Sequence, residues 1–266
     1  MKWLIVVLTL LFQPILQIEA VDPNSRAFQE LLEFVEIPTG LSSVELVAIT
    51  QQCWLQKGKE RWEYDMRHEN LKERLWPLFD QMGLLQEISP LKSQYDYAFV
   101  QGALLSRVEA RVNYLTFLWN EGIRFDEIVF LTGARPLLDS EKERIPGAAT
   151  ERDMVEWVYH RSNLPKDVPV IFINASMKQR EDGTRARPQT IDTVTCWLKM
   201  DPKEGSCLAI SNQPYISHMD AVLRRLIPKS FEIESVGPAV IGSPSVAIIL
   251  DTIARELYER NFVPRI

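Results

Sequence analysis

The sequence predicts an α/β protein with three layers, in which helices cover both faces of a doubly wound parallel sheet of about five strands. A helical N-terminal segment precedes this sheet. Two observations carry the prediction: strand-like runs alternate with helical runs from residue 91 onward, and the first two strands each end in a polar residue plus glycine, at 101–102 and 132–133. Such turns are typical of the carboxyl edge of a parallel sheet, where ligands bind.

Residues 21–90 are predicted as a helical lead-in. The first helix is marked by apolar residues at spacings of three and four: Phe28, Leu31, Leu32 and Val35. Residues 38–40, Pro-Thr-Gly, end that helix, and the Ser-Ser-x-Glu run at 42–45 matches a capping box for the next one. The charged stretch 57–74 is expected to add one or two further helices.

Residues 91–266 are predicted as the α/β domain. Short runs rich in β-forming residues predict strands at 96–101, 127–132, 168–174, 206–211 and 231–236. Each is followed by a helical run, at 107–121 (stopped by Gly122), 150–160, 189–200, 217–227 and 245–261. Parallel strands joined by right-handed helical crossovers form a Rossmann-like sheet that is covered on both faces.

Composition limits the functional classes. The chain has 266 residues, enough for one large domain or one domain with an appendage. Its net charge of -6 argues against a nucleic-acid-binding surface, which needs a basic face. Cys53, Cys196 and Cys207 show no metal-ligand spacing, so no metal site is predicted. Export would permit one disulfide among them, although burial as small apolar residues fits Cys196 and Cys207 better.

Residues 1–20 have the pattern of a signal peptide or membrane anchor. Lys2 precedes an almost wholly apolar run at 3–12, and Ala20 suits the position before a cleavage site, although Ile18 is bulkier than the preferred residue two places earlier. A cleaved leader predicts an extracytoplasmic protein, and an uncleaved one a tether to the membrane. A buried first strand or helix fits less well, because the run shows no amphipathic period.

The glycine turns do not match the common nucleotide motifs. Neither contains the three glycines of the dinucleotide fingerprint, and no Walker lysine follows Gly102. A classical NAD or P-loop site is therefore a poor fit, and the sequence identifies no cofactor. Two long connections, residues 134–149 and 175–188, lie at carboxyl ends of strands, and loops of that length are often functional.

The order of polar residues around the strands is more specific than any one of them. In chain order the series is Arg111, Thr132-Gly133, Glu151, Thr190, Asp192 and residues 211–215. This series resembles the YdcF/SanA/ElyC family of bacterial envelope-associated α/β proteins, a domain family largely of unknown function, across roughly residues 96–236. The chain departs from the family pattern at Asp220, which stands about where the family has an arginine, and at Gln189 and Thr193, where the family has asparagines.

The resemblance and the turn positions together predict a site at the carboxyl edge of the sheet. The candidate catalytic residues are Glu151, Asp192 and His218. The candidate ligand-binding residues are Gln101, Gly102, Arg111, Thr132, Gly133, Thr190, Thr193, Ser211, Asn212 and Tyr215. In this interpretation Arg111 and the Gly133 turn hold an anion, and Glu151 or Asp192 serves as acid or base.

The predicted function is that of an exported or membrane-tethered protein that binds a small polar or phosphorylated ligand, such as an envelope precursor, in cell-envelope biogenesis or integrity. Whether it catalyses a reaction stays open. The alternative is a non-catalytic binding or scaffold protein of the envelope, which the charge reversal at Asp220 favours. If the protein is cytoplasmic, the resemblance implies S-adenosylmethionine binding instead.

Overall fold

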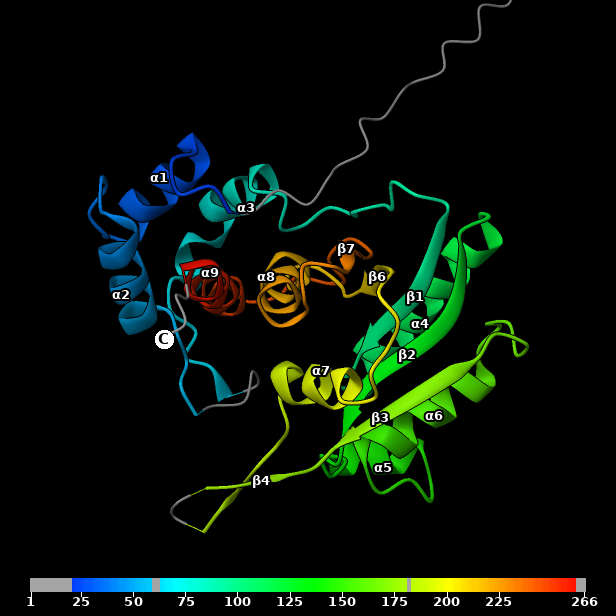
Figure 1. Ribbon diagram of the computed structural model, residues 1–266. Coiled ribbons are helices and arrows are strands. Elements are labelled where there is room, and N and C mark those ends of the chain that lie inside the picture. The colour runs from blue at the N-terminus through cyan, green and yellow to red at the C-terminus, as the bar shows by residue number, and fades with distance from the viewer. Residues whose placement is uncertain (1–20, 59–62, 181–182, 262–266) are drawn as a thin grey trace, which may run out of the picture.

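The computed structural model describes residues 21–58, 63–180 and 183–261 (Figure 1). The predicted leader, residues 1–20, lies outside the described residues. A five-stranded sheet has the order β3-β2-β1-β6-β7, and every neighbouring pair of strands is parallel. Its strands are β1 (Gln94–Gln101), β2 (Arg124–Gly133), β3 (Val170–Ala175), β6 (Ser206–Ile210) and β7 (Glu232–Val236). The predicted three-layer α/β fold is therefore confirmed.

Helices cover both faces of this sheet (Figure 1). One face carries α4 (Leu105–Asn120) and α6 (Glu151–Arg161), and the other carries α7 (Thr190–Leu198) and α8 (Ile216–Leu226). Side chains along β1 alternate between two apolar clusters: Ala98 and Val100 join the α4 side, whereas Phe99 joins the α7 side. This period of two explains why the buried strand is apolar throughout.

The two long connections contain short elements that the sequence analysis did not predict. Residues 134–149 include α5 (Asp139–Arg144), and residues 175–188 include a hairpin of β4 (Lys178–Gln179) and β5 (Arg185–Ala186). Glu141 on α5 is 4% exposed, and its Oε1 accepts a hydrogen bond from the Leu105 N–H of α4 at 3.0 Å. This buried bond holds the first connection against the domain, and such a tertiary contact leaves no periodic pattern in the sequence.

The lead-in forms the helices α1 (Arg26–Phe34), α2 (Ser43–Cys53) and α3 (Lys72–Gln81), with a 3₁₀ turn, η2 (Glu69–Leu71), before α3. The predicted capping box is confirmed, since the Ser42 N–H donates to Glu45 Oε2 at 2.9 Å. The last helix, α9 (Val246–Asn261), packs on both α2 and α8. Its Ile249 and Ile253 share one apolar cluster with Phe28 of α1, so the lead-in and the last helix form a common core.

Within the described residues, no helix is both long and apolar enough to cross a membrane. The three cysteines are free thiols. Cys207 is buried in β6, as predicted, and Cys196 on α7 is half-buried.

Candidate functional site

A cavity of about 410 Å³ lies beside the ends of β1 and β2. The turn after β1, the starts of α7 and α8, one side of α9 and parts of the lead-in form its wall. The sheet order puts β2 on one side of β1 and β6 on the other, so the direction of the crossovers changes between β1 and β6. Open α/β sheets bind ligands at such a switch point, and the volume suits a small molecule.

The fold brings most of the predicted site residues to this cavity, although they are distant in the sequence. Those in its lining are Gln101, Gly102, Arg111, Glu151, Thr190, Thr193, Tyr215 and His218. The others lie outside the lining that the described residues form: Thr132, Gly133, Asp192, Ser211 and Asn212.

Arg111 organises the polar contacts at the switch point. Its side chain projects from α4 and is 3% exposed. Nη1 donates to the carbonyl oxygens of Gln101 at 2.7 Å and Gly102 at 3.1 Å, and Nε donates to Asn212 Oδ1 at 3.0 Å. Arg111 thereby ties the end of β1 to the segment after β6. These bonds give it a positioning role in addition to its place in the lining.

The carboxylate of Glu151, in the first turn of α6, lies between the ends of β1 and β2. Oε2 accepts a hydrogen bond from the Gly133 N–H at 3.2 Å, and Oε1 lies 3.7 Å from Arg135 Nε. A Cβ added at Gly102 would come within 2.9 Å of Glu151 Cδ, so glycine leaves room for this carboxylate. Burial raises the pKa of Glu151, and the positive charge of Arg135 offsets only part of that effect. The carboxyl group is therefore suited to carrying a proton at the cavity.

Gln101 brings unused hydrogen-bonding capacity to the same place. It ends β1, lines the cavity and is 4% exposed. Neither its amide nitrogen nor its amide oxygen has a hydrogen-bond partner among the residues that the structure describes. A buried amide without partners is destabilising, so this side chain fits a position that contacts a ligand.

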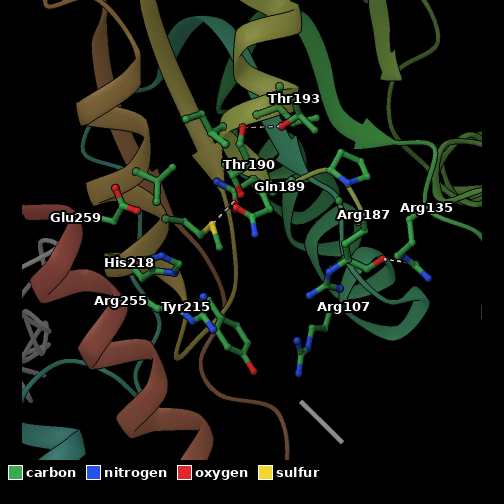
Figure 2. A pocket seen from close by; sticks show the side chains of 18 of the residues that line it. Arg107, Arg135, Arg187, Gln189, Thr190, Thr193, Tyr215, His218, Arg255 and Glu259 are labelled. Atoms are coloured by element: carbon green, nitrogen blue, oxygen red, sulfur yellow. Dashed lines mark hydrogen bonds between the residues drawn. The ribbon is translucent and has the colours of Figure 1, made fainter. Parts of the chain in front are cut away.

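Arginine dominates the charged residues of the lining, which the sequence analysis did not predict. Six arginines stand against two glutamates: Arg107, Arg111, Arg135, Arg187, Arg225, Arg255, Glu151 and Glu259. Three of the six are paired with carboxylates, namely Arg135 with Glu141, Arg225 with Glu259 and Arg255 with Asp251. The lining is thus rich in guanidinium groups, although the net charge of the chain is -6. Figure 2 shows Arg107 and Arg187 on one side of the cavity and Arg255 on the other.

On the wall formed by α8 and α9, the arginines pair with carboxylates of the protein. Arg255 Nε lies 2.7 Å from Asp251 Oδ2, and this aspartate also accepts from the Tyr64 hydroxyl at 3.0 Å. Arg225 on α8 forms an ion pair with Glu259 on α9. These pairs join the two helices to each other and to the lead-in.

The wall nearer the sheet edge carries two further arginines. Arg187 is exposed in the segment just before α7, and Arg107 is half-buried on α4. The guanidinium carbon of Arg107 lies 4.7 Å from the centre of the Tyr215 ring, a cation–π contact that orients it along the cavity. His218 is 9% exposed and lies on the side of Arg255 (Figure 2). An anion entering from solvent would reach Arg187 first, because the other arginines of the lining are half-buried or buried.

Asp192 and Gly133 have structural roles outside the lining. Asp192 Oδ2 accepts from the Gln189 N–H at 2.7 Å, which caps α7, and lies 2.7 Å from Lys178 Nζ. A Cβ at Gly133 would come within 2.1 Å of Pro188 Cγ, so this glycine permits a close protein contact. The expected acid–base role of Asp192 and the expected anion contact at the Gly133 turn therefore gain no support from the geometry.

The three other predicted residues also contact protein groups or lie beneath the site. The Thr132 hydroxyl donates to the Ile173 carbonyl, which joins β2 to β3. Asn212 accepts from Arg111, and Ser211 is 1% exposed. The Thr132 and Asn212 side chains thus hold neighbouring parts of the sheet edge together, whereas the buried Ser211 hydroxyl has no hydrogen-bond partner among the described residues.

The sequence analysis missed several arginines of the lining, although the sequence contains a signal for two of them. Arg135 and Arg187 lie in the two long connections that were expected to be functional, so arginines in those loops were available candidates. Arg225 and Arg255 lie on helices, where no local pattern shows which side faces the site.

Comparison of the chain with protein-family models, with curated proteins and with solved structures finds no match. The resemblance to the YdcF/SanA/ElyC family therefore remains a prediction from the sequence. Among the described residues, no group of three or more His, Cys, Asp or Glu side chains is arranged to hold a metal ion.

Proposed function

We propose that this protein binds a small anionic ligand of the phosphate-ester class in the cavity at the carboxyl edge of its sheet. The observation that carries the proposal is the lining, in which six arginines stand against two glutamates. Guanidinium groups bind phosphate oxygens through two parallel hydrogen bonds, and their charge persists at any physiological pH. A cavity of about 410 Å³ has the size of a metabolite site.

The residues divide this task according to their accessibility. Arg187, which is exposed, makes the first contact with the phosphate, and the half-buried Arg107 makes the next one. The amide of Gln101 supplies a donor and an acceptor for a neutral polar part of the ligand. Arg111 holds the turn after β1 in place through its bonds to two backbone carbonyls.

The sequence adds a proposed setting for this binding. The leader-like pattern of residues 1–20 and the resemblance to envelope-associated proteins support an exported or membrane-tethered protein. An envelope precursor that carries a phosphate group is the ligand that best unites this setting with an arginine-lined cavity.

A second candidate function is hydrolysis of the bound ester, and one observation favours it. Burial raises the pKa of Glu151 at the edge of an arginine-lined cavity. A carboxyl group that keeps its proton can donate it to a leaving oxygen, while arginines stabilise the charge on the phosphate. Binding without turnover is the simpler function, and the two are separable by measurement.

Calorimetric titration with glucose 1-phosphate and inorganic pyrophosphate tests the binding. Neutral glucose and the dicarboxylate succinate are the matched probes. We expect the phosphates to bind and glucose not to bind, with affinity that falls as salt rises. Replacing Arg187 or Arg107 with alanine removes a charge-assisted contact and should weaken binding about 10-fold or more.

The control variant is Arg152→Ala, which removes an arginine of α6 that is outside the lining. It should bind like the wild type. If no anion binds, or if Arg152→Ala weakens binding as much as Arg187→Ala, the cavity is not the binding site. That result would favour the alternative of a non-catalytic scaffold protein. Release of inorganic phosphate from glucose 1-phosphate, lost in Glu151→Gln with binding retained, would establish turnover.

A further inference from the structure

The backbone nitrogen of Val21 contacts a fully buried carboxylate. The Val21 N–H donates to Glu256 Oε1 on α9 at 3.0 Å. The Val21 side chain is 3% exposed and belongs to the apolar cluster that the lead-in shares with α9, whereas the next residue, Asp22, is exposed. Val21 is therefore anchored by both its side chain and its nitrogen.

Among the described residues, Glu256 accepts hydrogen bonds from three separate parts of the chain. It has 0% exposure, and besides the Val21 contact it accepts from Arg260 Nε at 2.8 Å and from the Ser217 hydroxyl at 2.6 Å. A carboxylate so buried is stable only with charged or well-placed donors around it. An added positive charge at the position of the Val21 nitrogen would strengthen this arrangement.

The sequence supplies a way to produce that charge. Ala20 has the size expected before a signal-peptidase cut, after the apolar run of residues 3–12, so the bond predicted to be cut is the one that joins Ala20 to Val21. The pattern in the sequence and the contact in the structure are independent, and both single out Val21.

We propose that residues 1–20 are removed and that the α-ammonium group of the new first residue, Val21, forms a buried ion pair with Glu256. Hydrolysis adds water across the Ala20–Val21 peptide bond. The hydroxyl goes to the carbonyl carbon of Ala20, and the hydrogen goes to the nitrogen of Val21, which takes up one more proton from solvent. An amide that donates one hydrogen bond becomes a cation that donates three.

This pair would connect maturation to the wall of the cavity. Glu256 lies on α9 and is not itself in the lining of the cavity. Its neighbours Arg255, Tyr258 and Glu259 on the same helix do line the cavity. The same carboxylate holds Ser217 at the start of α8. The proposed ion pair therefore adds to a contact that already joins α8 to α9. The inference goes beyond the proposed anion binding and does not depend on it.

The first test is the N-terminus of the exported protein. The full chain is expressed in a bacterial host with an export pathway and purified, and its intact mass and N-terminal sequence are determined. We expect the mass of residues 21–266 with a free amine at Val21. An unprocessed chain, or one that begins at another residue, would overturn the proposal.

The second test measures the ion pair. Chains that begin at Val21 are compared with chains that keep Ala20, in which the ammonium group is displaced by one residue. At pH 7 the unfolding midpoint of the Val21 chain should be higher by about 2 to 4 °C, the shift typical of a chain of this size. In the Glu256→Gln background this difference should disappear. Equal midpoints for the two wild-type chains would refute the pair.

The pH dependence has a defined sign. Besides Glu256, the charged groups around the nitrogen are Arg260, Asp220 on α8, which lies 3.8 Å from Arg260, and the exposed Asp22. The gain is full below about pH 8, where an ordinary α-amino group is protonated, and it is lost at higher pH as the paired ammonium gives up its proton. If Glu256→Gln does not fold, acetylation of the Val21 amine serves instead and should remove the gain. An acetylated chain as stable as the free one would refute the pair.

Discussion

Replacing Gly102 with alanine would put one methyl group into the contact between the end of β1 and Glu151. The ideal Cβ lies 2.9 Å from Cδ and 3.0 Å from each carboxylate oxygen of Glu151. Gly102 has no positive φ, so alanine is compatible with its backbone and the whole effect comes from this contact.

The loss of folding free energy caused by this methyl group can be estimated from the distances. An ordinary contact between heavy atoms is about 3.5 Å, so the carboxylate must move by about 0.5 Å. The bond from the Gly133 N–H to Glu151 is already 3.2 Å long and would be lost by such a shift. Overpacking of this kind costs about 1–3 kcal/mol of folding free energy.

Urea denaturation of four proteins isolates the contact. They are the wild type, Gly102→Ala, Glu151→Ala and the double variant. We expect the alanine at 102 to destabilise the wild type by about 1–3 kcal/mol. Without the Glu151 side chain it should be neutral, or stabilising by about 0.4–1 kcal/mol, because alanine restricts the unfolded chain. An equal cost in both backgrounds would refute the assignment, since the cycle would then show no coupling between the two positions.

Two further predictions concern the same edge of the sheet. The pKa of Glu151 is raised above its ordinary value of 4.5 by burial, so ionisation of this group weakens folding as pH rises through the folded-state pKa. Glu151→Gln should therefore be more stable than the wild type at pH 7 and equally stable below about pH 4. Urea denaturation midpoints measured from about pH 3.5 to 8 check this prediction. A variant that is less stable than the wild type at pH 7 contradicts it. Arg111→Ala leaves two carbonyls and Asn212 without their donor, so it should lose about 3 kcal/mol or more of stability, measured by urea denaturation. A small loss of stability together with a large loss of anion binding would instead make Arg111 chiefly a ligand contact.

Local patterns in the sequence were enough to predict the strands and main helices of the α/β domain. They also predicted the edge of the sheet at which a site would lie. Alternating strand and helix periods, with glycines at 102 and 133, are local patterns, and β1 and β2 end within one residue of their predicted ends. Because parallel strands share one carboxyl edge, Gln101, Gly102, Glu151 and Tyr215 could be assigned to that edge from sequence alone. The helix α5 was missed because a tertiary contact, the bond from the Leu105 N–H to Glu141, holds it. The strands β4 and β5 were missed because each has two residues, too few for a periodic pattern.

The side chains that meet at this edge could be identified only from the folded chain. Asp192 and Arg111 lie near the predicted edge and have residue types suited to a site. Asp192 nevertheless caps α7, and Arg111 donates to backbone carbonyls, because each side chain points toward protein groups. Arg225 and Arg255 reach the cavity because α9 packs between α8 and the lead-in, a contact between segments about 200 residues apart. The guanidinium groups of the lining thus come from segments far apart in the chain, and composition, which reports only a net charge of -6, does not reveal that they gather at one place.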